Sequence, residues 1–202
     1  MKARWFTLCA AAALVAPLGV AHAQDSYDPM SPSRYTLELY LAQYSIDNPV
    51  PGEGREGVGG FGARLMFGRG DATKVVSSFF NRARAGVFAT YTAKKNFVST
   101  LHAGGQADFP LFAAPVVNGF LDPFVSLGAG VFRSSIDDEA FGPTVPAGFS
   151  ASNSSFAVTP AVGTLIPITG SIKFRGDLRD VIVFESGTNH NFVAEGGISI
   201  GF

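Results

Sequence analysis

The sequence predicts an all-β fold, a closed antiparallel eight-stranded transmembrane β-barrel preceded by a cleavable signal peptide. Three observations lead to this fold class. The N-terminus has the layout of an export signal, eight alternating segments follow between turn-rich stretches, and the composition is unusual for a water-soluble domain. Of 202 residues, 24 are glycine and 19 are phenylalanine, and only 15% are charged, against about 25% in soluble domains. So few charges would leave much of a soluble protein's surface uncovered.

The overall charge and the cysteine content exclude several function classes. A formal net charge of −1 excludes a basic nucleic-acid binder that relies on neutralising phosphates. The hydrophobic share of 47% argues against global disorder. The single cysteine, Cys9, falls in the predicted signal, so the mature chain has no disulfide and no cysteine-ligated metal. We predict no catalytic residue, no metal and no cofactor.

Residues 1–23 are predicted to form the signal peptide. Lys2 and Arg4 give a short positive region, an apolar run follows over 5–20, and Ala21-His22-Ala23 places small residues where a signal peptidase reads the chain. A retained membrane helix is the alternative, but the polar residues directly after the small ones argue against it. Cleavage is expected after Ala23.

The rest of the chain divides into a lead-in and a barrel. Residues 24–34 are polar and contain prolines, so they are predicted to lead into the first strand; residues 35–202 form the barrel. No later stretch offers the roughly 18 uninterrupted apolar residues of a spanning helix. Alternating segments bounded by turn residues instead predict strands. The eight predicted strands are 35–46, 58–67, 84–92, 97–109, 121–132, 156–166, 171–184 and 191–202.

The alternation assigns one face of each strand to lipid and the other to the barrel interior. An arginine or lysine that faced lipid at the midplane would cost about 2–4 kcal/mol, so the charged faces are predicted to point inward. The apolar residues expected to face lipid at the waist are Leu37, Leu39, Phe61, Leu65, Val87, Leu127, Val131, Val162, Phe174, Leu178, Ile198 and Ile200. The charged residues predicted to form a polar network in the lumen are Glu38, Arg64, Arg84, Lys173, Arg175, Asp177, Arg179 and Glu195.

These lumen charges can be interpreted in two ways. The functional interpretation is a charged path for ions. The structural interpretation is a polar core of paired charges. We favour it because the interior of an eight-stranded barrel is just wide enough for side chains to fill and because unpaired buried charges are costly. Five basic residues against three acidic ones leave an imbalance, which Asp108, Asp122 or trapped water is expected to correct. If the last hairpin is centred on Gly187, Glu195 lies opposite Arg179 and pairs with it, and Ser199 lies opposite Arg175.

The chain end and one central strand resemble a known family. The last strand resembles the C-terminal insertion signal of bacterial outer-membrane barrels, with Glu195, Gly197, Ile200 and Phe202 at its positions. Residues 122–130 resemble the glycine-rich central strand of small eight-stranded outer-membrane barrels related to the barrel of outer-membrane protein A. The resemblance implies export to the bacterial outer membrane, insertion by the barrel-assembly machinery, and contact with outer-membrane lipid and lipopolysaccharide. It does not extend to the peptidoglycan-binding domain that some relatives carry, and it gives no oligomeric state.

An even strand number with both termini in the periplasm fixes the expected topology. Outer loops are predicted at 47–57, 94–95, 134–155 and 185–190, and periplasmic turns at 68–83, 110–119 and 167–170. A short helix is expected within 71–80, where apolar residues recur at helical spacing, although these residues could instead extend the third strand. Pro160 falls inside the sixth strand, so we expect a bulge there or a later start of the strand.

Two sequence motifs are read as structural, and a third is absent. Residues 57–62 match G-x-G-x-x-G, but no helix pattern follows, as a dinucleotide site requires. Arg-Gly-Asp occurs at 69–71 and 175–177, in a predicted turn and a predicted strand. A lipid A deacylase would be expected to carry a histidine followed two residues later by serine, and neither His102 nor His190 is followed in this way.

The leading functional hypothesis is a non-enzymatic outer-membrane barrel with a polar, largely plugged interior. It would act in envelope integrity or through its surface loops. The alternative is a narrow porin-like channel for small solutes or ions, and an enzyme that modifies lipid A is a third hypothesis.

Overall fold

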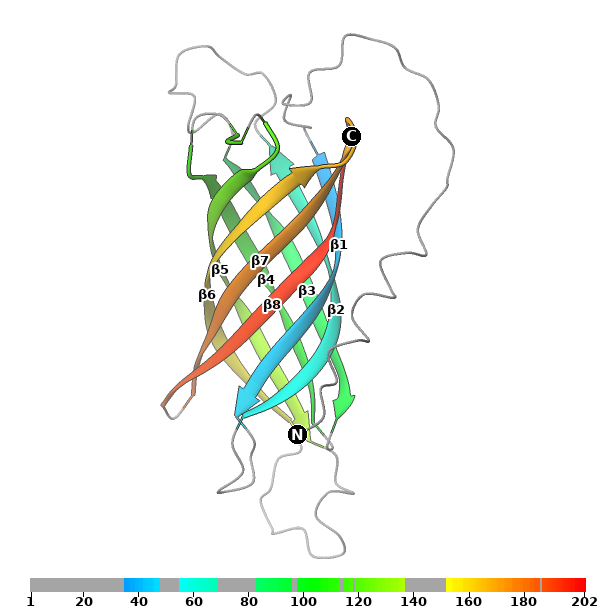
Figure 1. Ribbon diagram of the computed structural model, residues 1–202. Helices are drawn as coiled ribbons and strands as arrows, with labels where there is room; N and C mark the ends of the chain where they lie inside the picture. Colours follow the sequence, from blue (N-terminus) through cyan, green and yellow to red (C-terminus); the bar gives the residue numbers. More distant parts are fainter. Residues whose placement is uncertain are drawn as a thin grey trace, which may run out of the picture.

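Eight antiparallel strands form one closed barrel (Figure 1). The structure is a computed structural model that describes residues 35–47, 55–68, 83–95, 98–112, 115–117, 119–136, 152–185 and 187–202. Each strand pairs with its neighbours in sequence, and β1 pairs with β8. The strands are β1 (Tyr35–Asp47), β2 (Arg55–Gly68), β3 (Arg84–Lys95), β4 (Val98–Pro110), β5 (Asp122–Ile136), β6 (Ser152–Pro167), β7 (Ile172–Phe184) and β8 (Thr188–Gly201).

The predicted number of strands is therefore confirmed, and the differences lie at strand ends. β2 begins three residues earlier than predicted, and β5 and β6 each extend four residues further at the end of the barrel away from the chain termini. The predicted signal peptide 1–23, the lead-in 24–34 and the helix expected within 71–80 lie outside the described residues. So do residues 48–54 and 137–151 of two expected outer loops.

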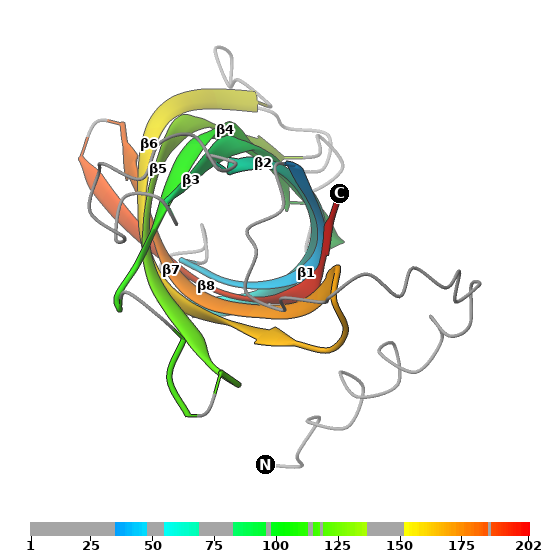
Figure 2. The same cartoon turned by 90° about the horizontal axis from the view of Figure 1, so that it is seen from above.

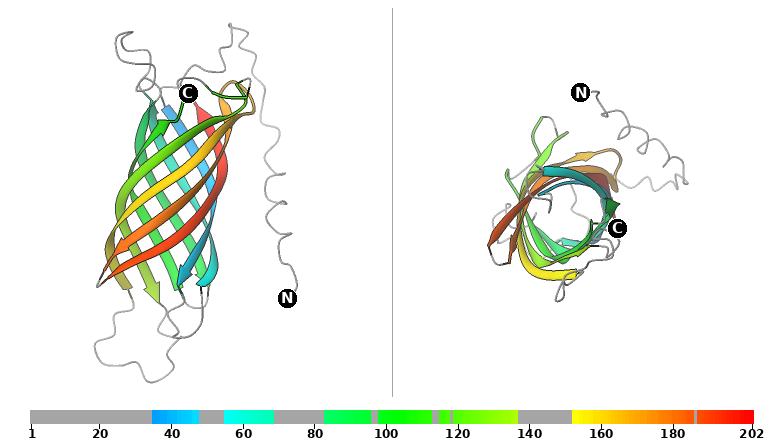
Figure 3. Two further views of the ribbon diagram at one scale, coloured as in Figure 1. Left: turned by 60° about the vertical axis from the view of Figure 1, so that its left-hand side comes forward. Right: turned by 90° about the horizontal axis from the view of Figure 1, so that it is seen from below.

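Closure joins the first strand to the last. β1 and β8 form a continuous antiparallel ladder from Thr36–Gly201 to Ser45–Phe192. At the end of this ladder, the amide of Tyr35 donates to the carbonyl of Phe202 at 3.1 Å, and the amide of Phe202 donates to the carbonyl of Tyr35 at 3.0 Å. The view along the barrel in Figure 2 shows the resulting ring, and Figure 3 shows the same wall from two further directions. Closure removes both sheet edges, so every strand has two neighbours.

The alternation of side chains follows the predicted faces. On β1, Glu38 and Tyr40 are buried inside, whereas Leu39 between them is 54% exposed on the outer face. All twelve residues expected on the outer face point outward: ten are exposed, and Leu65 and Ile198 are half-buried. No strand is thus shifted by one residue, which would have exchanged its two faces.

Pro160 does not produce the expected bulge. β6 runs without a break through the proline, and Pro160 pairs with Leu127 of β5. Toward β7, the ladder is interrupted between the pairs Val158–Ile182 and Ala161–Arg179, and the register is the same on both sides. The expectation was wrong because a proline removes a single donor, directed at a single neighbour, and the rest of the ladder holds the register.

The β7–β8 register differs by two residues from the predicted one. Phe184 pairs with Thr188, and the amide of Glu185 donates to the carbonyl of Gly187 at 3.0 Å, so the turn is centred on residue 186 rather than on Gly187. Ser199 consequently lies opposite Lys173 instead of Arg175. A shift of two residues changes partners but keeps every side chain on its predicted face.

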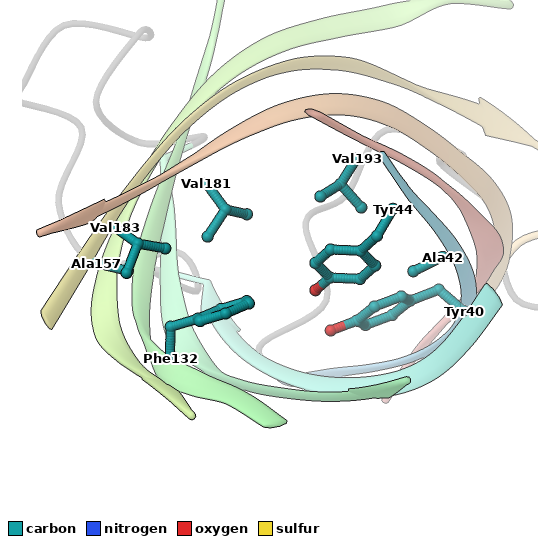
Figure 4. Close-up of a cluster of buried hydrophobic side chains, with 8 residues drawn as sticks. All are labelled: Tyr40, Ala42, Tyr44, Phe132, Ala157, Val181, Val183 and Val193. Atoms are coloured by element: carbon teal, nitrogen blue, oxygen red, sulfur yellow. The ribbon is translucent and has the colours of Figure 1, made fainter. Parts of the chain in front are cut away.

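An apolar cluster and a group of charged side chains lie in different halves of the interior. The half away from the chain termini holds an apolar cluster, in which the rings of Tyr44 and Phe132 point inward from different parts of the wall (Figure 4). The half nearer the termini holds buried charges, described below. The members of the apolar cluster are Tyr40, Ala42, Tyr44, Phe132, Ala157, Val181, Val183 and Val193.

Candidate functional site

Eight charged side chains meet inside the barrel and form what we call the lumen ion-pair cluster. Four arginines face four carboxylates, so the formal charge of the cluster is zero. Seven of its members are buried residues, and the side chain of Arg84 is only 11% exposed. The cluster consists of Glu38 from β1, Arg64 from β2, Arg84 from β3, Asp108 from β4, Arg175, Asp177 and Arg179 from β7, and Glu195 from β8.

One part of the cluster is built on the β1–β2 pair. Glu38 lies directly opposite Arg64, and the Arg64 Nη1 to Glu38 Oε2 distance is 3.1 Å. The same guanidinium also reaches across the lumen, to Asp177 at 3.6 Å and to Glu195 through Nη2. Arg64 therefore links three strands of the wall through three carboxylates.

A second part is built on the β3–β4 pair. Asp108 lies opposite Arg84 and accepts a bond from its Nη2 at 3.0 Å. From β7, Nη1 of Arg175 reaches the same carboxylate at 2.5 Å and Glu38 at 3.3 Å. Asp108 thus supplies the missing negative charge, as the sequence suggested. These bonds cross the interior and join β7 to β4 and β1.

The salt bridge predicted between Glu195 and Arg179 is present, but its predicted geometry is wrong. Nε of Arg179 lies 2.8 Å from Oε2 of Glu195, yet the residue directly opposite Glu195 is Asp177. The two-residue shift of the hairpin makes the pair diagonal. Arg179 also donates to Asp177 at 2.9 Å, so one arginine is bonded to both neighbouring carboxylates.

Two aromatic rings support the cluster, each beside a glycine on a neighbouring strand. The guanidinium of Arg64 lies 4.1 Å from the centre of the Tyr40 ring, and Tyr40 lies opposite Gly62. A Cβ atom at Gly62 would stand 2.5 Å from that ring. Cation–π contacts of this kind strengthen when they are shielded from water.

The second ring repeats this arrangement. The guanidinium of Arg175 lies 4.2 Å from the centre of the Phe124 ring, and Phe124 lies opposite Gly163 of β6. A Cβ atom at Gly163 would stand 2.6 Å from Cζ of that phenylalanine. Sequence reasoning missed both rings, because the pairing of an aromatic residue with a glycine becomes visible only when the register is known.

The remaining predicted residues also have defined places. Lys173 is half-buried on β7 opposite Ser199. Of the proposed insertion signal, Glu195 belongs to the ion-pair cluster and Gly197 lies opposite Tyr40. Ile200 points outward, and the Phe202 ring stacks on Tyr35 at 6.1 Å. The role of these residues in insertion stays a prediction.

A separate polar pair lies on the outer face at the end away from the termini. Nδ1 of His190 lies 2.7 Å from Oδ2 of Asp180, and the histidine side chain is 50% exposed. Arg55 donates to the backbone carbonyls of His190 and Ser45. Sequence reasoning missed this pair. Among the described residues, no three histidine, cysteine, aspartate or glutamate side chains are grouped as a metal ion would require.

Exposed aromatic rings gather at both ends of the barrel. At the end with the chain termini, Tyr35 contacts Phe67 and Phe202 at ring distances of 5.9 and 6.1 Å. At the other end, Phe156 stacks on Phe184 at 6.1 Å. Two aromatic groups separated by an apolar band are typical of barrels that span a membrane, where the rings lie at the two interfaces.

Comparison with known proteins supports the fold. No model of a protein family matches the chain, and no curated protein was found to be similar in sequence. Among solved structures, Neisserial surface protein A is similar with a TM-score of 0.59 at 11% identity, over 84% of this chain and 98% of that one. The N-terminal barrel of OprF from Pseudomonas aeruginosa aligns with a TM-score of 0.49 at 12% identity, over 83% and 97%. Ail from Yersinia pestis aligns with a TM-score of 0.48 at 12% identity, over 84% of this chain and 99% of that one. The likeness to Neisserial surface protein A shows that the chain has the fold of small eight-stranded outer-membrane barrels.

Proposed function

We propose that the protein is an integral barrel of the bacterial outer membrane with a plugged, non-conducting interior. It contributes to the integrity of the envelope or binds partners through the chain between its strands at the outer end. The single observation that carries this proposal is the polarity of the barrel, with charged side chains inside and large apolar side chains outside.

The outer face suits hydrocarbon better than water. Leu127, Val162 and Leu178, on three neighbouring strands, are 56%, 52% and 63% exposed. Exposed apolar area carries a free-energy cost in water of about 25 cal/mol per Å², and soluble monomers rarely expose contiguous apolar patches beyond a few hundred Å². A lipid bilayer removes this cost, and a closed barrel exposes no unpaired backbone groups to the lipid.

The plug rests on two successive layers of the interior. The lumen ion-pair cluster crosses the barrel through bonds such as Arg64–Glu195 and Arg175–Asp108. Beyond it, the apolar cluster lies in the other half. An ion would have to break buried charge pairs, which costs about 3–5 kcal/mol for each stranded partner, and then pass the apolar cluster.

The orientation follows from the shared position of the chain ends. Both ends of the barrel chain, Tyr35 and Phe202, lie at one end of the wall, which we assign to the periplasm. The predicted signal peptide 1–23 and the predicted insertion signal at Glu195, Gly197, Ile200 and Phe202 support export and insertion by the barrel-assembly machinery. Outer-membrane lipid and lipopolysaccharide then surround the barrel.

The test combines single-channel recording with a deletion strain. The refolded barrel in planar bilayers is expected to give no steady unitary current under conditions in which a large porin conducts. Steady currents would overturn the plug and favour the narrow channel. A strain that lacks the gene should become more permeable to large antibiotics, and the wild-type gene should restore the barrier. Release of fatty acid from lipid A by the purified protein, abolished by His190→Ala, would instead indicate an enzyme.

A further inference from the structure

Three buried polar atoms on one wall of the lumen have no hydrogen-bond partner among the described residues. They are Oε1 of Gln106 on β4, Oγ of Ser126 on β5 and Oγ1 of Thr159 on β6. The three residues are only 5%, 4% and 0% exposed. Buried side-chain polar atoms in folded proteins nearly always have a protein or water partner, so three such atoms together require an explanation.

The three residues are neighbours of Gly128 in the sheet. Gln106 lies directly opposite this glycine on β4, Thr159 lies opposite it on β6, and Ser126 precedes it by two residues on the same face of β5. Neighbouring strands are about 4.8 Å apart, so Gln106 and Thr159 flank a position that has no side chain. A Cβ atom at Gly128 would collide with Oγ1 of Thr159 and lie 3.3 Å from Cβ of Gln106. Oγ1 of Thr159 therefore lies over the glycine, and Cβ of Gln106 flanks the same position from the other side.

The lumen ion-pair cluster fixes the orientation of the amide. Nε2 of Gln106 donates to Oδ1 of Asp108 at 2.8 Å, which leaves Oε1 as the free acceptor. Turning the amide over would break this bond and bring its oxygen toward a carboxylate. The eight members of the cluster come from β1 to β4, β7 and β8, so the wall formed by β5 and β6 contributes none of its charges.

We propose that this wall holds an internal water molecule over Gly128, bound by Gln106, Ser126 and Thr159. The water donates to Oε1 of Gln106 and exchanges hydrogen bonds with the two hydroxyl groups. A buried water makes about three hydrogen bonds, which matches the three partners. A cation fits poorly, because the three groups are uncharged and the nearest carboxylate, Asp108, is already bound by Arg84 and Arg175. The plug thus contains water as well as ion pairs, and the water lies at the β5–β6 wall, which contributes none of the charged side chains.

The substitution Thr159→Val tests this site by the sign of its effect. If Thr159 is bound to water, valine deprives the water of a partner, and the unfolding equilibrium constant in urea should rise about fivefold for the barrel refolded in lipid vesicles. If the hydroxyl is simply unpaired, valine removes a buried polar group at no loss, and the unfolding constant should fall. Thr159→Val and Ser126→Ala should also be non-additive in a double-mutant cycle, because they share the water.

A matched control lies on the same strand. The hydroxyl of Thr164 is also buried without a partner among the described residues, but this residue points to the outer face of β6. Thr164→Val should leave the unfolding constant unchanged or lower it.

The direct measurement is a nuclear Overhauser contact between water and the amide proton of residue 128 in the wild-type barrel. We expect this contact in the wild type and its loss in Thr159→Val. Absence of the contact from the wild type overturns the proposal, whatever the variant does and even if the variant fails to fold. A stabilising effect of Thr159→Val overturns it as well.

Discussion

Glu195 lies directly opposite Asp177 in the β7–β8 hairpin, and both carboxylates accept a bond from the same atom, Nε of Arg179, at 2.8 and 2.9 Å. Like charges on directly opposite residues destabilise a sheet. Arg64 of β2 also contacts both carboxylates. The two acids are therefore stable side by side only while both arginines remain in place, so the four residues behave as one unit.

Removing one charge from this unit should destabilise the barrel. Glu195→Gln keeps the shape of the side chain but leaves Arg179 and Arg64 with less compensating charge in a buried site. Because an uncompensated buried charge is costly, we expect a loss of about 3 kcal/mol in the free energy of unfolding, measured by urea titration in lipid vesicles.

The control for this change is Glu185→Gln. Glu185 is exposed next to the hairpin turn, and its carboxylate accepts a bond from Ser155 at 2.9 Å. Exposed polar pairs contribute little, so the change should be less than about 1 kcal/mol. Equal losses for the two variants would show that burial of Glu195 does not determine its contribution.

Gly62 should tolerate no side chain. In Gly62→Ala, the new methyl group collides with the ring of Tyr40, which also bonds the hydroxyl of Thr90 at 2.8 Å and lies beneath Arg64. Overpacking of this kind costs about 1–3 kcal/mol, and the unfolding titration should show that loss. Gly59→Ala is the matched control on the same strand, because nothing lies within 4 Å of the added atom. It should be close to neutral.

The strands and their faces could be predicted from the sequence because they depend on local alternation. Side chains alternate between the two faces of a strand, so Glu38 and Leu39 are assigned to opposite faces whichever strand pairs with them. The predicted ends of the strands were less accurate, because a strand continues as long as its neighbour has residues to pair with it. β5 and β6 extend each other in this way, up to the pair Ser135–Ser152.

The partners within the site could not be predicted because they depend on register. One residue in the centre of the last turn decides whether Glu195 faces Arg179 or Asp177. No pattern in the sequence distinguishes residue 186 from Gly187 as that centre. The contacts that cross the lumen, such as Arg175 with Asp108, join strands that are not neighbours, and no pattern along the chain reports them.

Closure can be tested with a designed disulfide. Leu39 of β1 and Ile198 of β8 are directly opposite on the outer face, and opposite residues in a sheet have Cα atoms within the range that a disulfide spans. In a background with Cys9 replaced by serine, the double variant Leu39→Cys and Ile198→Cys should form an intramolecular disulfide on mild oxidation. A mobility shift in gel electrophoresis, reversed by reductant, would show it. Leu39→Cys with Leu127→Cys, on β5, should give no such shift, and a shift of equal yield there would argue against the closed ladder.

The depth of the barrel in the bilayer can be tested with one charge at two heights. Leu178 is 63% exposed on the outer face of β7 near the waist, whereas Ile168 is 57% exposed in the β6–β7 turn at the end with the chain termini. An arginine on the lipid face costs about 2–4 kcal/mol at the midplane and about 0–1 kcal/mol near the interfaces. Leu178→Arg should therefore lower the free energy of unfolding in vesicles by about 2–4 kcal/mol and reduce insertion during refolding. Ile168→Arg should change both little, although the two side chains are similarly exposed. If the two variants behave alike, the outer face does not lie in hydrocarbon, and the membrane assignment fails.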